Sequence, residues 1–215
     1  MTGVTIFTSG STQLPKKVYH KYQTLNLHIN RSIEEIQLTH TDIVLDVFPG
    51  NTIAHYVVTA QPAIKAGANL FTTSFDPYNY VKVFNEIKPS YIALIPRHIE
   101  LLEKSKSWKE LDMSSVRYMV IGSQKVEQSL IDLLRSKGVK TVANWYGMTE
   151  MPPPVFVGYN SESFDFTPKI GYSIDFTEEG ECIINGLHTN DIFDLDTKKF
   201  LYRKEHAPNR TWKSL

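Results

Sequence analysis

Short apolar segments alternate with amphipathic segments of helical period through the first 150 residues, and this alternation constrains the fold more than any other feature. Residues 91–95 are apolar throughout, as in a strand buried on both faces of a sheet, and residues 116–121 form a second expected strand. Three leucines between residues 130 and 134 share one helical face, and Gly138 ends that helix. Strands joined through helices are parallel because each connection crosses the sheet. The sequence therefore predicts an α/β fold with a mainly parallel sheet flanked by helices.

The other expected elements continue this alternation. Strands are expected at residues 4–8, 43–48, 69–73 and 141–144, and helices at residues 22–38, 53–65 and 76–89. Two helix starts carry capping signals. Ser32 and Glu35 have the spacing of a capping box, which would start the first helix late. Asp76 is the expected N-cap of the third helix, with Pro77 at its first position.

After Glu150 the pattern changes. Met151 and three prolines interrupt the alternation, and short strands with turns follow at residues 181–185, 191–195 and 200–203. We therefore expect an α/β core over residues 1–150 and a small β-rich subdomain over residues 151–215.

Charge and cysteine content exclude several classes of function. The 23 basic residues balance the 23 acidic ones, so we expect neither a nucleic acid nor a membrane surface as a partner. Cys182 is the single cysteine, which excludes an internal disulfide and a multi-cysteine zinc site. No basic and then apolar leader opens the sequence, and no apolar run approaches membrane-spanning length. The cytoplasm is the expected location.

A cluster of hydroxyl groups directly after the first expected strand is a candidate phosphate-binding loop. Hydroxyls and backbone amides hydrogen-bond phosphate oxygens, and a lysine adds positive charge. The spacing differs from that of a Walker A loop, and a polar surface loop is the alternative. The candidate residues are Thr8, Ser9, Gly10, Ser11, Thr12 and Lys16.

Three further candidate segments lie in or after expected strands, where ligands bind to parallel sheets. In the segment at residues 144–150, an aromatic ring could stack on a base, a glycine allows close approach, a hydroxyl could contact phosphate and a carboxylate could hold Mg²⁺. The segment at residues 122–124 is a tight turn. The segment at residues 189–191 carries an acid that could accept hydrogen bonds from both ribose hydroxyls, although an acid in a turn is usually a solvated cap. The segments are Asn144, Trp145, Tyr146, Gly147, Met148, Thr149 and Glu150; Gly122, Ser123 and Gln124; and Thr189, Asn190 and Asp191.

Together, the order and separation of these four segments resemble the adenylate-forming superfamily, which includes acyl-CoA synthetases, adenylation domains of peptide synthetases and luciferases. Residues 8–16 are similar to its phosphate loop, T-S-G-S-T-G-x-P-K-G, and residues 146–150 match Y-G-x-T-E. Residues 122–124 correspond to the glycine turn beside adenine, and residues 189–191 to T-G-D. The resemblance extends from about residue 5 to residue 203.

The resemblance implies an ATP- or AMP-binding domain that activates a carboxylate as acyl-AMP and releases pyrophosphate. Lys16, Thr149 and Glu150 would be the catalytic residues: Lys16 and the loop hydroxyls would bind the outer phosphates, Thr149 the α-phosphate and Glu150 Mg²⁺. Tyr146 would stack on adenine and Asp191 would hold the ribose.

Two assignments within the resemblance stay open. Arg203 and Arg210 compete for the role of the arginine that follows the ribose-binding acid. Thr52 stands where the family often has the histidine of its acyl pocket, P-x-x-H, and His55 follows one helical turn later. His55 either lines the carboxylate pocket or is a helix histidine with its hydrogen bonds satisfied.

Departures from the family pattern leave a second function open. Gln13, Lys17 and Asn190 replace glycines, and asparagine tolerates positive φ best after glycine. We expect this chain to lack the family's N-terminal region and its mobile C-terminal domain, which carries a lysine to the site. The alternatives are therefore an adenylating enzyme and a non-catalytic nucleotide-binding module or core that needs a partner domain in trans. The expected partners are a small carboxylate, CoA or a carrier-protein thiol, and a second copy or a partner supplying the missing domain.

Overall fold

The structure is a computed structural model that describes residues 2–7 and 17–204. Its centre is a six-stranded sheet whose first five strands are parallel and whose last strand is antiparallel. The strands, in spatial order, are β4 (Asn69–Thr72), β3 (Ile43–Asp46), β5 (Tyr91–Leu94), β6 (Tyr118–Gly122), β7 (Thr141–Tyr146) and β8 (Phe156–Tyr159). The predicted fold class is confirmed.

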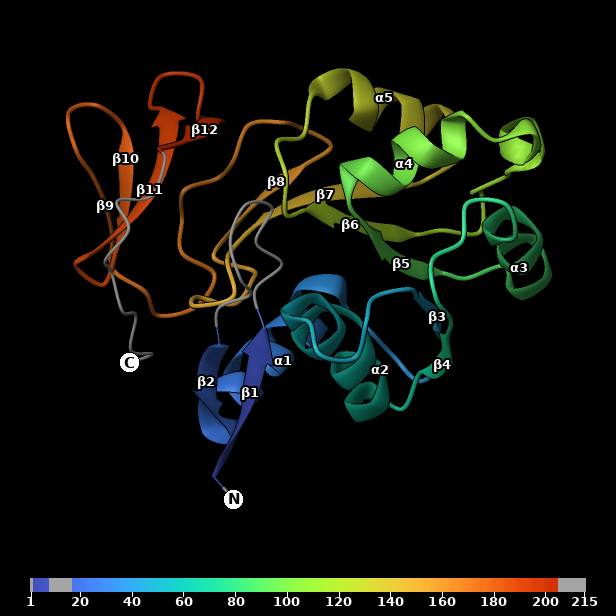
Figure 1. Ribbon diagram of the computed structural model, residues 1–215, viewed down its shortest axis with the longest axis horizontal. Helices are drawn as coiled ribbons and strands as arrows, with labels where there is room; N and C mark the ends of the chain where they lie inside the picture. The colour runs from blue at the N-terminus through green and yellow to red at the C-terminus, as the bar shows by residue number, and fades with distance from the viewer. Residues whose placement is uncertain (1, 8–16, 205–215) are drawn as a thin grey trace.

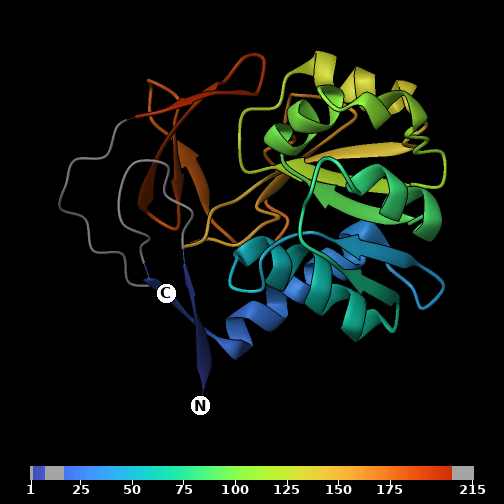
Figure 2. The same ribbon diagram turned by 45° about the vertical axis from the view of Figure 1, so that its right-hand side comes forward.

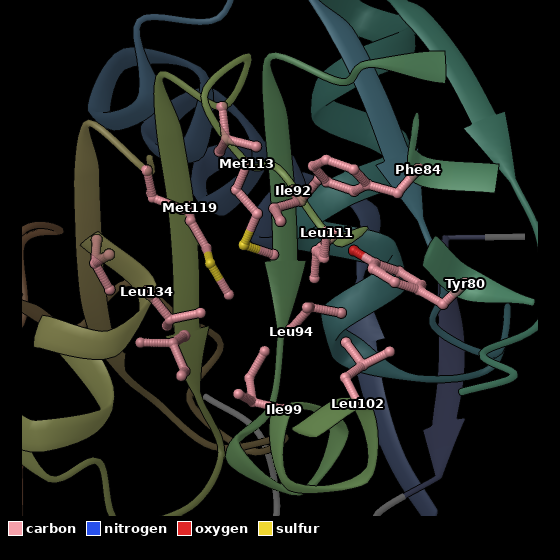
Figure 3. Close-up of a cluster of buried hydrophobic side chains, with 14 of the residues drawn as sticks. Tyr80, Phe84, Ile92, Leu94, Ile99, Leu102, Leu111, Met113, Met119 and Leu134 are labelled. Atoms are coloured by element: carbon pink, nitrogen blue, oxygen red, sulfur yellow. The ribbon is translucent and has the colours of Figure 1, made fainter. Parts of the chain in front are cut away.

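Helices cover both faces of this sheet (Figure 1). One face is covered by α1 (Tyr22–Ile36), η1 (Ala54–Ala60) and α2 (Gln61–Ala66), and the other by α3 (Tyr80–Ile87), α4 (Pro96–Glu103), η2 (Lys106–Glu110) and α5 (Gln128–Ser136). Adjacent strand residues point to opposite faces, so Tyr91 packs with the first group and Ile92 with the second. Figure 3 shows the second core, where Met119 and Leu134 lie beside Ile92 and Leu94.

Two smaller antiparallel units complete the described chain. The hairpin pairs β1 (Gly3–Phe7) with β2 (Lys17–Lys21). The small sheet has the spatial order β12 (Lys199–Arg203), β11 (Leu187–Asp194), β10 (Glu181–Ile184) and β9 (Ile174–Phe176). Figures 1 and 2 show the small sheet to one side of the layered core. An aromatic cluster that includes Tyr146, Phe156 and Phe193 packs between the two.

Several expected boundaries are wrong. Helix α1 begins at Tyr22, and Ser32 is a buried residue inside it, so the late start does not occur. Helix α3 begins at Tyr80 rather than at Pro77, although the Asp76 carboxylate and carbonyl accept hydrogen bonds from Tyr78 N and Tyr80 N in the turn that leads into the helix. The expected helix at residues 53–65 is present at these bounds, and its first part is π-helical, η1, before α2 continues it.

Three strands and two helices were not anticipated: β2, β8, β9, α4 and η2. Strand β8 lies beyond Glu150 and pairs with β7, so the core sheet reaches past the change in composition. In the part of the chain that the structure describes, no helix is long and apolar enough to cross a membrane.

Candidate functional site

Tyr146 ends strand β7 at the carboxyl edge of the parallel strands. Its ring is 8% exposed and stacks on Phe156, with ring centroids 4.6 Å apart. Its hydroxyl donates a hydrogen bond of 2.7 Å to Asp191 Oδ2, and burial raises the pKa of Tyr146 well above its usual value. One face of the ring is therefore taken by Phe156, and adenine stacking on Tyr146 stays a prediction.

Asp191 joins the core to the small sheet. The residue is fully buried on β11, and Arg203 from β12 donates to it through Nε at 2.5 Å and Nη2 at 2.6 Å. This bidentate contact raises the pKa of Arg203. Arg210 lies outside the described residues, so Arg203 is the arginine that the structure pairs with Asp191. Asn190 has φ 63°, as expected for the residue that replaces a glycine.

The segment after Tyr146 turns tightly back on itself. A side chain at Gly147 would come within 2.7 Å of the Pro153 backbone, so this position needs glycine. Thr149 and Glu150 are half-buried. Within residues 2–7 and 17–204 the Glu150 carboxylate has no hydrogen-bond or ion-pair partner, although its charge acts on His20 and Arg203.

His20 on β2 connects the hairpin to this segment. The residue is 1% exposed, and its Nε2 lies 2.7 Å from the Thr149 carbonyl oxygen. Burial lowers the pKa of His20, against the opposing effects of the Thr149 hydrogen bond and the Glu150 charge. The hairpin also reaches the loop between β3 and η1, where Phe7 N donates to Asn51 O at 3.4 Å.

The candidate phosphate loop, Thr8 to Lys16, lies outside the described residues. Its flanking residues Phe7 and Lys17 are paired in register, and the hairpin that they end contacts the Thr149 carbonyl through His20. The roles predicted for Thr8, Ser9, Gly10, Ser11, Thr12 and Lys16 stay predictions.

The turn after β6 lies beside β7. Gly122 pairs with Trp145, and a Cβ at Gly122 would lie 2.5 Å from the Trp145 carbonyl oxygen. Ser123 has φ 64°, and Gln124 Oε1 accepts a hydrogen bond of 3.1 Å from Arg97 N. Asn144 and Trp145 are 3% exposed, so their side chains belong to the interior beside the turn.

Thr52 and His55 lie at the other end of the carboxyl edge, beyond β3. Thr52 Oγ1 donates to Pro49 O at 2.8 Å and accepts from His55 N at 3.3 Å, which caps the start of η1. His55 Nδ1 lies 2.5 Å from the fully buried Asp46 carboxylate, which also accepts from Thr59 Oγ1 at 2.7 Å. The His55 side chain is 20% exposed, so it is anchored on one nitrogen and still reaches the surface.

The structure therefore brings the predicted residues together in two groups. One contains Tyr146 to Glu150, the turn at Gly122, Asp191 and Arg203, and the other contains Thr52 and His55. Sequence reasoning missed His20 and Asp46. Asp46 could have been found from the sequence, because it is an acid at the end of an apolar strand. No feature of the residues around His20 marks it as part of the site.

Comparison with known proteins identifies the family. The family model described as AMP-binding enzyme matches residues 3–179. The chain belongs to the AMP-binding enzyme family. The match covers the hairpin and the β7 segment, and the roles that the resemblance implies for individual residues stay predictions.

Curated members of this family are distantly related to the chain. Indoleacetate–CoA ligase from Aromatoleum aromaticum is 25% identical over 210 residues, which are 97% of this chain and 40% of the ligase. 4-Coumarate–CoA ligase 3 from Arabidopsis thaliana is 26% identical over 153 residues, 68% of this chain and 27% of the ligase. The chain thus spans less than half the length of these two relatives.

Solved structures share the fold. An acyl-CoA synthetase-like protein from Dyadobacter fermentans superposes with a TM-score of 0.75 at 19% identity, over 94% of this chain and 60% of that one. O-succinylbenzoate coenzyme A synthetase from Bacillus subtilis, in complex with ATP and magnesium ion, superposes with a TM-score of 0.73 at 19% identity, over 93% and 49% of the chains. At these identities the likeness establishes the architecture alone.

Proposed function

We propose that this chain binds ATP and activates a small carboxylic acid as an acyl-adenylate, with release of pyrophosphate. The observation that carries the proposal is the convergence of three distant segments. The Tyr146 hydroxyl reaches Asp191 on the small sheet, and His20 joins the hairpin to the Thr149 carbonyl oxygen. The purine, ribose and phosphate groups of one nucleotide would then be bound by neighbouring segments at the carboxyl edge of the central sheet.

In this reaction the protein mainly has to position the two substrates and stabilise the negative charge on the phosphates. The acid is already ionised, so its oxygen can attack the α-phosphorus without a general base, and pyrophosphate leaves. Lys16 would stabilise charge on the outer phosphates and the Thr149 hydroxyl would contact the α-phosphate. Asp191 and Arg203 would hold the ribose.

Mg²⁺ fits the donors present at Glu150. This carboxylate is half-buried and has no protein partner among the described residues, so its oxygens are available. The described residues hold no group of three or more metal-binding side chains. That agrees with Mg²⁺, which usually takes one or two carboxylates and completes its shell with phosphates and water. When bound, the ion would neutralise charge on the phosphates.

The names of the relatives support a choice of acid and final acceptor. Indoleacetate–CoA ligase, feruloyl-CoA synthase and 4-coumarate–CoA ligase are named for aromatic acids and CoA. We therefore place aromatic acids first among the candidate substrates, before fatty and amino acids, and CoA before a carrier-protein thiol as the acceptor. His55, anchored by Asp46, would line the acyl end.

ATP–pyrophosphate exchange over a panel of carboxylates tests the proposal. We expect exchange with at least one acid, dependent on Mg²⁺ and weakest in Lys16→Ala. Calorimetry with ATP and AMP runs in parallel. AMP binding without exchange would favour the nucleotide-binding module that works with a partner domain in trans, and no binding of either nucleotide would overturn the proposal.

A further inference from the structure

A buried histidine occupies a position where the sequence pattern favours an apolar residue. Strand β2 alternates, with Val18 and His20 buried and the three residues around them exposed. His20 is 1% exposed, and within the described residues its side chain makes one hydrogen bond, across 129 residues of sequence to the Thr149 carbonyl oxygen, at 2.7 Å. A leucine would fill this buried position equally well, so burial alone does not explain why the residue is a histidine.

The hydrogen bond determines how the imidazole is protonated. A carbonyl oxygen only accepts, so His20 Nε2 carries the proton and donates it. His20 Nδ1 is buried and has no partner among the described residues. Burying an unpaired acceptor costs free energy. The unpaired Nδ1 therefore lowers the stability of the fold, while Nε2 donates a hydrogen bond to the Thr149 carbonyl oxygen.

Holding this carbonyl oxygen orients more than one atom. The peptide unit between Thr149 and Glu150 is planar, so its oxygen and the Glu150 amide turn together. Anchoring the oxygen therefore restricts the direction in which the chain enters Glu150. On the other side, β2 is held in register with β1 from Gly3↔Lys21 to Phe7↔Lys17.

From this geometry we infer that His20 is a positioning residue. It ties strand β2 to the Thr149–Glu150 peptide, so that the Glu150 carboxylate, the proposed Mg²⁺ ligand, keeps one placement relative to the β1–β2 pair. The inference rests on the proposed function for its consequence, which is selective support of ATP with Mg²⁺ over AMP. AMP lacks the outer phosphates and so depends less on that placement.

Two substitutions at His20 separate its hydrogen bond from its volume. His20→Gln keeps an N–H donor of similar reach, and His20→Leu fills the space without one. The matched control is His98→Leu, because His98 Nδ1 is also buried without a partner among the described residues, and the His98 ring stacks on Phe75 with centroids 4.0 Å apart.

Calorimetry of ATP with Mg²⁺ and of AMP without metal is the first readout. For His20→Leu we expect ATP affinity to fall roughly tenfold and AMP affinity less than about threefold, the size of one lost hydrogen bond to an ordered site. His20→Gln should recover most of the ATP affinity, and His98→Leu should leave the ratio of the two affinities unchanged. Equal loss for both nucleotides, or no rescue by glutamine, would overturn the inference.

Amide hydrogen exchange at residues 148–151 is the second readout and needs no nucleotide. We expect faster exchange there in His20→Leu and unchanged exchange in His98→Leu and His20→Gln, with all variants checked for cooperative unfolding. If the wild-type chain binds no nucleotide, the proposed function fails, while faster exchange still upholds the anchor. Unchanged exchange in His20→Leu would overturn it.

Discussion

Two polar clusters at the same edge of the sheet are built in different ways. The Tyr146–Asp191–Arg203 cluster joins residues 45 and 12 positions apart and bridges the core and the small sheet. The Asp46–His55–Thr59 cluster joins residues 9 and 13 positions apart within β3 and the helix that follows it. Asp191 and Arg203 already pair within the small sheet, so the first cluster is complete only when docking brings Tyr146 to Asp191. The second cluster is formed by one strand–helix unit.

This difference assigns the two clusters different tasks. The bridging cluster and the neighbouring Glu150 should control nucleotide and metal affinity together with the docking of the small sheet. The local cluster should control the acid alone.

The largest expected effect is at Glu150, next to the bridging cluster. Glu150→Gln removes the charge that we propose binds Mg²⁺, so ATP affinity in Mg²⁺ should fall about a hundredfold while AMP affinity changes little. Calorimetry with and without Mg²⁺ measures this. Glu178→Gln, the same chemical change at an exposed residue of the small sheet, is the control. Unchanged metal dependence in Glu150→Gln would remove Glu150 from its role.

Asp191→Asn should disturb stability and nucleotide affinity together. Arg203 loses its charge partner and the Tyr146 hydroxyl faces an amide, so we expect a loss of about 2 kcal/mol, moderated because Arg203 is partly exposed. AMP affinity should fall roughly tenfold, the equivalent of about 1.4 kcal/mol. Urea unfolding and calorimetry check the two parts, with the exposed Asp175→Asn on β9 as the control. Lost stability with unchanged AMP affinity would limit Asp191 to docking the sheets.

Asp42 provides a charged pair that lies away from both clusters, at the start of β3. Its carboxylate accepts hydrogen bonds of 2.7 Å from Arg117 Nε and Nη2, and these contacts with Ser90 and Arg117 outweigh burial and lower its pKa to about 2. The pKa is lower in the folded chain, so the pair stabilises the fold above the ordinary carboxyl pKa of about 4 and is lost as the pH falls toward 2.

Asp42→Asn should therefore cost about 1 kcal/mol at pH 7 and progressively less below pH 4, with nucleotide affinity unchanged. Urea unfolding of wild type and variant across this pH range measures the difference. A difference that stays constant down to pH 2 would contradict the assigned ion pair.

The smallest effect is expected at the local cluster. Asp46→Asn frees His55 from its anchor, so the Michaelis constant for the acid in pyrophosphate exchange should rise roughly three- to fivefold, with that for ATP unchanged. Thr59→Val, which removes another partner of Asp46, should change stability more than the acid constant. Equal changes in the Michaelis constants for ATP and for the acid would mean that the two clusters do not act on separate substrates.

The sequence predicted the layered core because its strands and helices carry their own periodicity. Residues 91–95 and the leucines of α5 needed no tertiary information. Strand β2 was missed because lysine and tyrosine surround its two buried residues, and β8 because it follows three prolines. Each is stabilised by a pairing partner rather than by its own pattern.

The candidate site likewise has parts that could be predicted from local sequence and parts that depend on tertiary contacts. The motif at residues 146–150 and the acid Asp191 could be read from the sequence, and so could the positive φ of Asn190. The contact between His20 and Thr149 could not, because no local rule relates residues 129 positions apart. The full pairing of the Asp191 carboxylate with Arg203 and Tyr146 likewise depends on the docked sheets.

A crystal structure of the chain with ATP and Mg²⁺ tests the central claim most directly. The account predicts one triphosphate bound by Lys16 on one side and Glu150 on the other, with the ribose at Asp191 and Arg203. ATP bound elsewhere, or contacts to Lys16 and Glu150 from separate molecules, would contradict a single nucleotide site.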